Sequence, residues 1–133
     1  MDIQKDLLTR QLYAQDASMY QELPEGVSFP TNVEQIQALV NQANKEGFSI
    51  TARSAGTSLA GQTTGNGVIM DVSRFMTELI EINPERKYAK VEPGVIRDTL
   101  NREAAKDQLL FGPDTATTNR CMIGGMVVNN SAG

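Results

Sequence analysis

The chain has 133 residues, of which 12 are Lys or Arg, 16 are Asp or Glu and none is His, so its formal net charge is −4. This length suits one domain with its own hydrophobic core, and an acidic chain without a basic run argues against a nucleic-acid partner. The absence of histidine excludes a Ser-His-Asp triad, histidine metal ligands and a histidine general base within this stretch.

The first quarter of the chain predicts a helix followed by a short strand. Residues 2–15 carry apolar side chains at helical spacing, which indicates an amphipathic helix. Residues 23–26 have the composition of a turn, and residues 27–29 alternate before stopping at a proline, as a short strand would.

The next segment predicts a long helix and a second strand. Residues 31–34 have the spacing of a capping box, in which the Thr31 hydroxyl takes the amide of Glu34. The helix that follows should end near Glu46, with Gly47 as its left-handed cap. Because residues 48–52 then have the composition of a strand, the strand–helix–strand order predicts a parallel pair with a right-handed crossover.

The rest of the chain predicts a central strand, a hairpin and shorter elements. The expected elements are a central strand at 68–72, an antiparallel hairpin of 79–82 and 87–91, a helix at 95–107, a short strand or extended piece at 109–111 and a helical turn near 122–128. The chain then stops in a turn rich in glycine and asparagine, from which we expect it to be a fragment of a longer protein.

A glycine-rich loop at residues 53–62 follows the second strand, and a second loop at residues 112–130 has a similar composition. Small residues leave consecutive backbone amides uncovered, and such amides bind anions. Thr57 and Ser58 can add hydroxyl donors, and Arg53 adds a positive charge. The alternative is that these loops are only tight turns.

Two other nucleotide-binding patterns fit the loop less well. Gly56 and Gly61 have the spacing of the P-loop of nucleoside triphosphatases, but Gln62 stands where that motif needs lysine, and residues 63–67 read as a turn. The Rossmann fingerprint is missing as well. A further alternative is a non-catalytic folded fragment without a bound ligand, which self-associates through an unfinished sheet edge.

The chain resembles the FAD-binding domain of the vanillyl-alcohol oxidase and para-cresol methylhydroxylase (PCMH) type. It is similar within that group to the D-lactate, glycolate and D-2-hydroxyglutarate dehydrogenases, most closely to the large members fused to an iron–sulfur module. The resemblance rests on Tyr13-x-x-Asp16-Ala17-Ser18-x-Tyr20, Phe29-Pro30, Arg53-x-Ala55-Gly56-Thr57-Ser58-Leu59-Ala60-Gly61-Gln62, Val91-Glu92-Pro93-Gly94-Val95, Gly112-Pro113-Asp114 and Asn119-Arg120-Cys121-x-Ile123-Gly124-Gly125-Met126-Val127-x-Asn129-Asn130.

The resemblance implies an FAD site made of both loops. The first loop wraps the pyrophosphate with backbone amides, with Ser58 also donating from its side chain. The segment of the second loop around Pro113 lies by the flavin and ribityl chain, and its later residues complete the cradle. The implied cofactor-binding residues are Arg53, Ser54, Ala55, Gly56, Thr57, Ser58, Leu59, Gly61, Gln62, Pro93, Gly94, Pro113, Asp114, Thr118, Ile123, Gly124, Gly125 and Asn130. No catalytic residue and no metal ligand is assigned.

The implied fold is α+β and PCMH-type, with a small parallel subdomain followed by the start of an antiparallel one, here truncated. The corresponding ranges are a helical lead-in at 1–26, the first subdomain at 27–72 and the beginning of the second at 73–133. The chain departs from the family pattern at Ala55 and Val128, where the family has glycine, so backbone approach to a ligand is expected to differ slightly there.

The implied function of the whole protein is that of an FAD-dependent dehydrogenase. It would oxidise a small D-2-hydroxy acid and pass electrons to a quinone, a cytochrome or an iron–sulfur module, while this fragment alone would be inactive. A cytoplasmic location is expected, with peripheral attachment to the inner membrane as an alternative, because the chain has no signal peptide and no apolar run of about 20 residues.

The sequence leaves the roles of a few further residues to be decided. Cys121 is the single cysteine, so no internal disulfide can form, and it is expected to be a small buried hydrophobe, with a redox or flavin-linking thiol as the alternative. Asp114 suits either a turn or a place near the flavin. Asp16, together with Ser18, is expected to cap its own turn.

Overall fold

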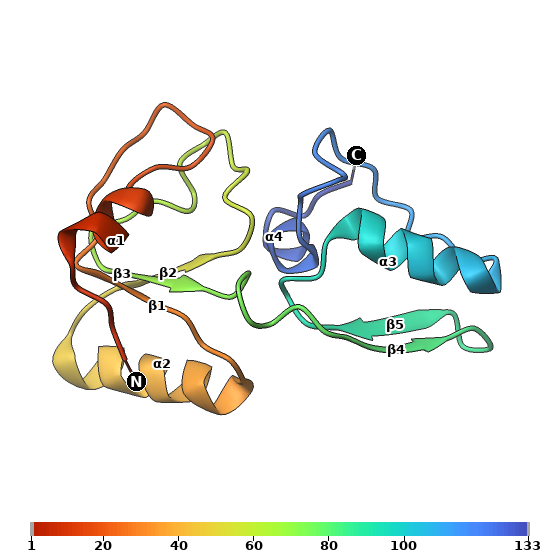
Figure 1. Ribbon diagram of the computed structural model, residues 1–133, viewed down its shortest axis with the longest axis horizontal. Coiled ribbons are helices and arrows are strands. Elements are labelled where there is room, and N and C mark those ends of the chain that lie inside the picture. The colour runs from red at the N-terminus through yellow and green to blue at the C-terminus, as the bar shows by residue number, and fades with distance from the viewer. Residues whose placement is uncertain (1, 133) are drawn as a thin grey trace.

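The computed structural model describes residues 2–132 and places them in two units, each with its own sheet (Figure 1). Helices and strands of both sheet types are present, so the predicted α+β class is confirmed. In chain order the elements are α1 (Leu7–Leu12), β1 (Gly26–Ser28), α2 (Val33–Glu46), β2 (Ile50–Arg53), β3 (Val68–Asp71), β4 (Leu79–Asn83), β5 (Tyr88–Val91), α3 (Arg97–Ala104), the 3₁₀ turn η1 (Ala105–Asp107) and α4 (Ile123–Val128).

The first unit is a parallel sheet in which β3 is the central strand, as predicted. The strand order is β1-β3-β2, with Val27 and Thr51 both opposite Ile69. All four residues of β3 are buried, as expected for a strand covered on both faces. The predicted parallel pair is therefore only partly right: β1 and β2 run parallel in one sheet, but β3 lies between them.

Helix α2 covers one face of this sheet and ends as predicted, at Glu46 followed by Gly47 with φ of 80°. Its start differs by one residue from the predicted box. The Asn32 side chain accepts the Gln35 amide at 2.9 Å, and the Gln35 side chain accepts the Thr31 amide at 2.9 Å. Asparagine is a stronger N-cap than threonine, which explains the shift. Its buried Leu39 packs with Val68, Met70, Val72 and Met76 in the core.

The predicted helix at 2–15 is shorter than expected because its first residues extend the sheet. Gln4 forms an antiparallel bridge with Val27, with hydrogen bonds of 2.8 and 2.9 Å in the two directions. Asp6 then caps α1 by accepting the Thr9 amide at 2.9 Å. A bridge to a strand more than 20 residues away leaves no local signal in the sequence.

The second unit begins with the predicted β4–β5 hairpin, above which α3 and η1 lie in Figure 1. The helix predicted at 95–107 is confirmed over Arg97–Ala104, while its first two residues are not helical and its last three form the 3₁₀ turn η1. Residues 109–111, all of them described, form no strand. Phe111 instead exchanges hydrogen bonds with the Asn101 side chain at 2.8 and 3.4 Å, so its backbone is satisfied without a strand partner. The helical turn near 122–128 is confirmed as α4.

None of the helices in the part of the chain that the structure describes has the length and apolarity needed to span a membrane.

Candidate functional site

A cavity of ≈ 430 Å³ lies between the loop that follows β2 and the segment around α4. The two loops singled out from the sequence therefore meet at one cavity. The predicted residues that line it are Arg53, Ser54, Ala55, Gly56, Thr57, Ser58, Gln62, Pro93, Gly124 and Gly125.

The other predicted residues do not line this cavity, and several lining residues were not predicted. The predicted residues outside the lining are Leu59, Gly61, Gly94, Pro113, Asp114, Thr118, Ile123 and Asn130. The lining residues that sequence reasoning missed are Ala52, Thr63, Val72, Thr115, Thr117, Cys121, Met122, Met126, Val128, Asn129 and Ser131. Most of these residues adjoin predicted positions. The sequence therefore identified the segments that form the cavity, but only some of the residues that line it.

Residues 54–58 present backbone amides at the cavity. No backbone carbonyl within residues 2–132 accepts a hydrogen bond from these five amides. Gly56 has φ of 66°, a left-handed conformation that glycine adopts without strain. Consecutive free amides around such a turn form a concave, partly positive surface that binds anions. The loop then leads through a turn into β3 and not into a helix, so the P-loop alternative is wrong.

The Ser58 hydroxyl forms its hydrogen bonds within the loop. Its side chain donates to Gln62 Oε1 at 2.9 Å and accepts the amides of Ala60 at 3.2 Å and Gln62 at 3.4 Å. Ser58 is also buried, with 7% of its surface exposed. In this structure its hydroxyl therefore folds the loop back on itself, where the resemblance implied that it donates to a ligand.

Arg53 lies beside the loop, with its guanidinium turned toward the N-terminal segment. Its Nη1 donates to the Gln15 carbonyl at 2.7 Å, and its Cζ lies 5.1 Å from the centre of the Tyr13 ring. A Cβ atom added to Gly56 would lie 2.7 Å from Arg53 Nη2. The expected positive charge is thus present at the loop, and it also fills the space that makes glycine necessary there.

Two glycines of α4 allow the second loop to approach the first. The Gly124 amide donates to the Pro93 carbonyl at 2.9 Å, and a Cβ at Gly124 would lie 2.6 Å from Pro93 Cβ. A Cβ at Gly125 would lie 2.7 Å from Ser54 Oγ. Gly124 therefore lets α4 approach Pro93, and Gly125 lies where the second loop comes close to the first.

Pro113, Asp114 and Thr118 are held by α3 and do not face the cavity. Arg97 donates through Nε to the Pro113 carbonyl at 2.8 Å, and its Nη2 lies 3.1 Å from Asp114 Oδ1. Thr118 donates through Oγ1 to Asp98 Oδ2 at 3.1 Å. The Arg97 side chain is only 11% exposed. These contacts hold both ends of the irregular stretch between Asp114 and Thr118, from which Thr115 and Thr117 line the cavity.

Cys121 lines the cavity as a buried side chain with close neighbours. Its Sγ lies 3.0 Å from Thr115 Oγ1 and 3.7 Å from Met126 Sδ, and 5% of the residue is exposed. This environment agrees with the expected small buried hydrophobe.

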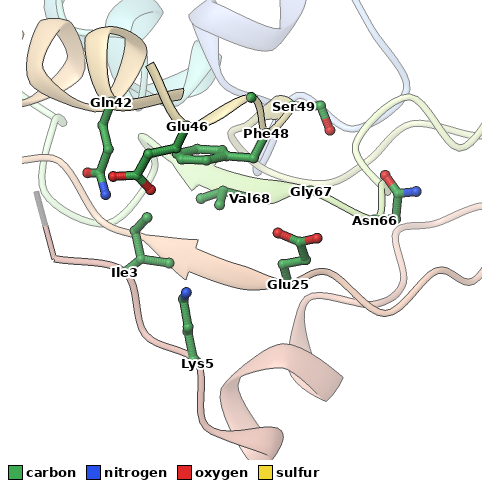
Figure 2. Close-up of a pocket in the computed structure, with 11 residues that line it drawn as sticks. Ile3, Lys5, Glu25, Gln42, Glu46, Phe48, Ser49, Asn66, Gly67 and Val68 are labelled. Atoms are coloured by element: carbon green, nitrogen blue, oxygen red, sulfur yellow. The ribbon is translucent and has the colours of Figure 1, made fainter. Parts of the chain in front are cut away.

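A second and larger cavity, of ≈ 730 Å³, lies at the opposite end of the parallel sheet (Figure 2). Glu25, Ser49 and Gly67 line it, and each directly precedes a strand, so this cavity is at the amino ends of the strands. Ala52, Arg53 and Val72 place the smaller cavity at the carboxyl ends. Ligands of parallel α/β sheets bind outside the carboxyl ends. We therefore assign function to the smaller cavity despite the difference in volume.

The fold and this cavity, with a glycine-rich loop on one side and a short helix on the other, have the features of a domain that binds a phosphorylated cofactor. The chain belongs to the FAD binding domain family, whose model matches residues 24–133. FAD is thus the cofactor of its class. The residues present fit that group, because the loop after β2 contributes free backbone amides and the segment around α4 contributes closely approached glycines and apolar side chains.

Curated relatives agree with this assignment. The chain is 36% identical over 135 residues to D-2-hydroxyglutarate dehydrogenase of Haemophilus influenzae, covering 99% of this chain and 13% of the relative. It is 39% identical over 121 residues to the Escherichia coli protein of that name, covering 89% and 12%. It is 32% identical over 118 residues to glycolate oxidase subunit GlcD of Escherichia coli, covering 87% and 23%. The chain therefore spans between an eighth and a quarter of their lengths.

Solved structures show the same fold. The chain matches alkyldihydroxyacetonephosphate synthase with a TM-score of 0.86 at 19% identity, over 98% of this chain and 27% of that one. It matches p-cresol methylhydroxylase with a TM-score of 0.80 at 23% identity, over 97% and 26%. The predicted PCMH-type fold is confirmed.

Proposed function

We propose that this chain forms the FAD-binding part of a flavin-dependent dehydrogenase that oxidises a small D-2-hydroxy acid. The observation that carries the flavin-binding part is the run of free amides at residues 54–58, which faces a cavity closed on its other side by α4. The oxidoreductase part is supported by relatives named D-2-hydroxyglutarate dehydrogenase and glycolate oxidase.

Each side of the cavity has a distinct part in this proposal. The amides of residues 54–58 bind the diphosphate, and the two glycines of α4 let the backbone come close to the cofactor. Thr115 and Thr117 present hydroxyl groups to the rest of it. Bound FAD supplies a two-electron acceptor for hydride from the alcohol carbon, while the residues of this chain bind and orient it and exclude water.

The substrate and the electron acceptor are the finer part of the proposal. The names of the relatives favour 2-hydroxyglutarate or glycolate, and the resemblance adds lactate. A quinone, a cytochrome or an iron–sulfur module would receive the electrons. The subdomain ranges 27–72 and 73–133 and the cytoplasmic location remain predictions.

The cofactor is tested by titrating the purified chain with FAD and following flavin fluorescence and absorption. We expect saturable binding, and binding of riboflavin at least tenfold weaker, because riboflavin lacks the diphosphate that the loop amides take. Equal affinity for FAD and riboflavin would contradict the role of residues 54–58.

The substrate is tested in the complete polypeptide that carries this domain. Anaerobic addition of D-2-hydroxyglutarate, glycolate or D-lactate should bleach the flavin absorption for the true substrate, and the L-enantiomer of a chiral substrate should leave it unchanged. Bleaching by none of the three would contradict the substrate class without affecting the cofactor assignment.

A further inference from the structure

The N-terminal segment at residues 13–20 packs against the outer side of the glycine-rich loop, although it precedes the residues matched by the family model. The Ala17 amide donates to the Gly56 carbonyl at 3.1 Å. A Cβ at Gly61 would lie 2.7 Å from Tyr20 Cδ2, so this ring covers the end of the loop. Together with the contact from Arg53 to Gln15, these interactions join the two segments at three points.

Asp16 makes a fourth and charged contact. Its Oδ1 accepts the Ser18 amide at 2.8 Å, which is the local turn expected from the sequence. Its Oδ2 accepts the Thr63 hydroxyl at 3.1 Å and the Thr63 amide at 3.4 Å, across 47 residues of chain. Burial raises the pKa of the Asp16 carboxyl, but the hydrogen bonds from Ser18 and Thr63 outweigh it, so its pKa lies below the ordinary value.

We propose that Asp16 is a positioning residue for the diphosphate-binding loop, which it holds in its cofactor-binding shape by bonding Thr63 at the end of that loop. The inference rests on the proposed function for its effect on FAD. Thr63 itself lines the cavity, and Asp16 is absent from the lining, so Asp16 acts through Thr63 and does not touch the cofactor.

The physical reason is the entropy of the loop. Its amides at residues 54–58 receive no backbone acceptor, so the free loop lacks the hydrogen bonds that keep a strand or helix in one conformation. Each residue that must be ordered on binding lowers the affinity. Bonds to Gly56 in the middle and to Thr63 at the end restrict the loop before a ligand arrives.

The decisive variant is Asp16→Asn. Its amide oxygen can still accept from Ser18, whereas its NH₂ group cannot accept from the Thr63 amide and can only donate to the Thr63 hydroxyl. The local turn is therefore kept, while the charged long-range contact is replaced by one weaker, uncharged hydrogen bond. Asp6→Asn is the matched control, since Asp6 also accepts one local amide, from Thr9, and has no contact with the loop. We expect the Kd for FAD to rise about tenfold in Asp16→Asn, the effect of one charge-assisted hydrogen bond, and to stay unchanged in Asp6→Asn.

A second variant tests the route through Thr63. If Asp16 acts through this residue, Asp16→Asn combined with Thr63→Val should bind FAD no more weakly than the weaker of the two single variants. Additive losses would show that Asp16 and Thr63 act separately, and would overturn the proposal.

A third measurement needs no cofactor. The ¹⁵N order parameters of the amides at residues 54–63 should fall from the rigid value of about 0.85 toward 0.6 in Asp16→Asn and remain high in Asp6→Asn. Unchanged order parameters, or the same fall in both variants, would overturn the positioning role. Failure of the unaltered chain to bind FAD would instead overturn the proposed function, and the order parameters would still decide the role of Asp16.

Discussion

The two loops that meet at the cavity are built in opposite ways. The loop at residues 53–63 has free amides facing inward and is held from outside by the N-terminal segment. The second loop, at residues 112–131, is held by the side chains of α3 and by α4, and it presents hydroxyl, sulfur and apolar groups to the cavity. One side thus offers backbone to an anion and the other offers side chains, which matches a cofactor with a phosphorylated end and a flat organic end.

We expect the largest loss of FAD binding from Gly56→Val in the first loop. The position has φ of 66°, where a β-branched residue is strained by about 1–3 kcal/mol, and the new Cβ would lie 2.7 Å from Arg53 Nη2. We expect FAD binding to be lost at concentrations that saturate the unaltered chain. Gly112→Val is the control in the second loop, because a Cβ there meets no atom within 4 Å, and it should bind normally. Normal binding by Gly56→Val would refute the assignment of the loop.

The contact between the loops is tested by Gly125→Ala. The added Cβ would lie 2.7 Å from Ser54 Oγ, so the Ser54 hydroxyl must rotate away from α4 or the two segments must separate. We expect the Kd for FAD to rise about tenfold, equivalent to roughly 1.4 kcal/mol. Removal of the opposing hydroxyl in Ser54→Ala should restore part of the affinity when both changes are combined. No rescue in the double variant would mean that the two loops are not coupled at this point.

The support of the second loop is tested by Arg97→Lys. Lysine keeps the charge but cannot reach the Pro113 carbonyl, Asp98 and Asp114 together as the planar guanidinium does. Because both carboxylates are exposed, loss of these contacts should lower the free energy of unfolding by only about 1 kcal/mol in a urea titration. We expect a smaller effect on FAD affinity than from Gly125→Ala, two- to threefold, because Arg97 is absent from the cavity lining. A weaker affinity for FAD with an unchanged free energy of unfolding would instead show that Arg97 contacts the cofactor.

The sequence predicted those parts of the fold and the site that depend on local pattern. The end of α2 at Gly47, the hairpin around its turn and both glycine loops follow from residue types at fixed spacing. The bridge from Gln4 to Val27, the bond from Asp16 to Thr63 and the Arg97 contacts join residues far apart in the chain or depend on side-chain direction, which spacing does not encode. For the same reason the sequence indicates a loop at Pro113 and Asp114 but not their contacts with Arg97.

The smallest effect is expected behind the first loop, where half-buried Tyr13 contacts buried Asp71. The Tyr13 hydroxyl donates to Asp71 Oδ2 at 2.5 Å, while its ring lies under Arg53. Tyr13→Phe keeps the ring and removes the hydrogen bond, so FAD affinity should stay within twofold. The free energy of unfolding at pH 7 should fall by about 1 kcal/mol.

The pH dependence of that stability difference identifies its cause. Burial, together with the hydrogen bond and the negative charge of Asp71, raises the pKa of Tyr13 above its ordinary value of 10.0. The unfolded chain therefore ionises first, and the stabilisation by Tyr13 is complete below pH 10 and declines as the pH rises above it. A difference between the unaltered chain and Tyr13→Phe that stays constant from pH 8 to pH 11 would show that the hydroxyl is not held by Asp71, and that the first loop is supported by the ring alone.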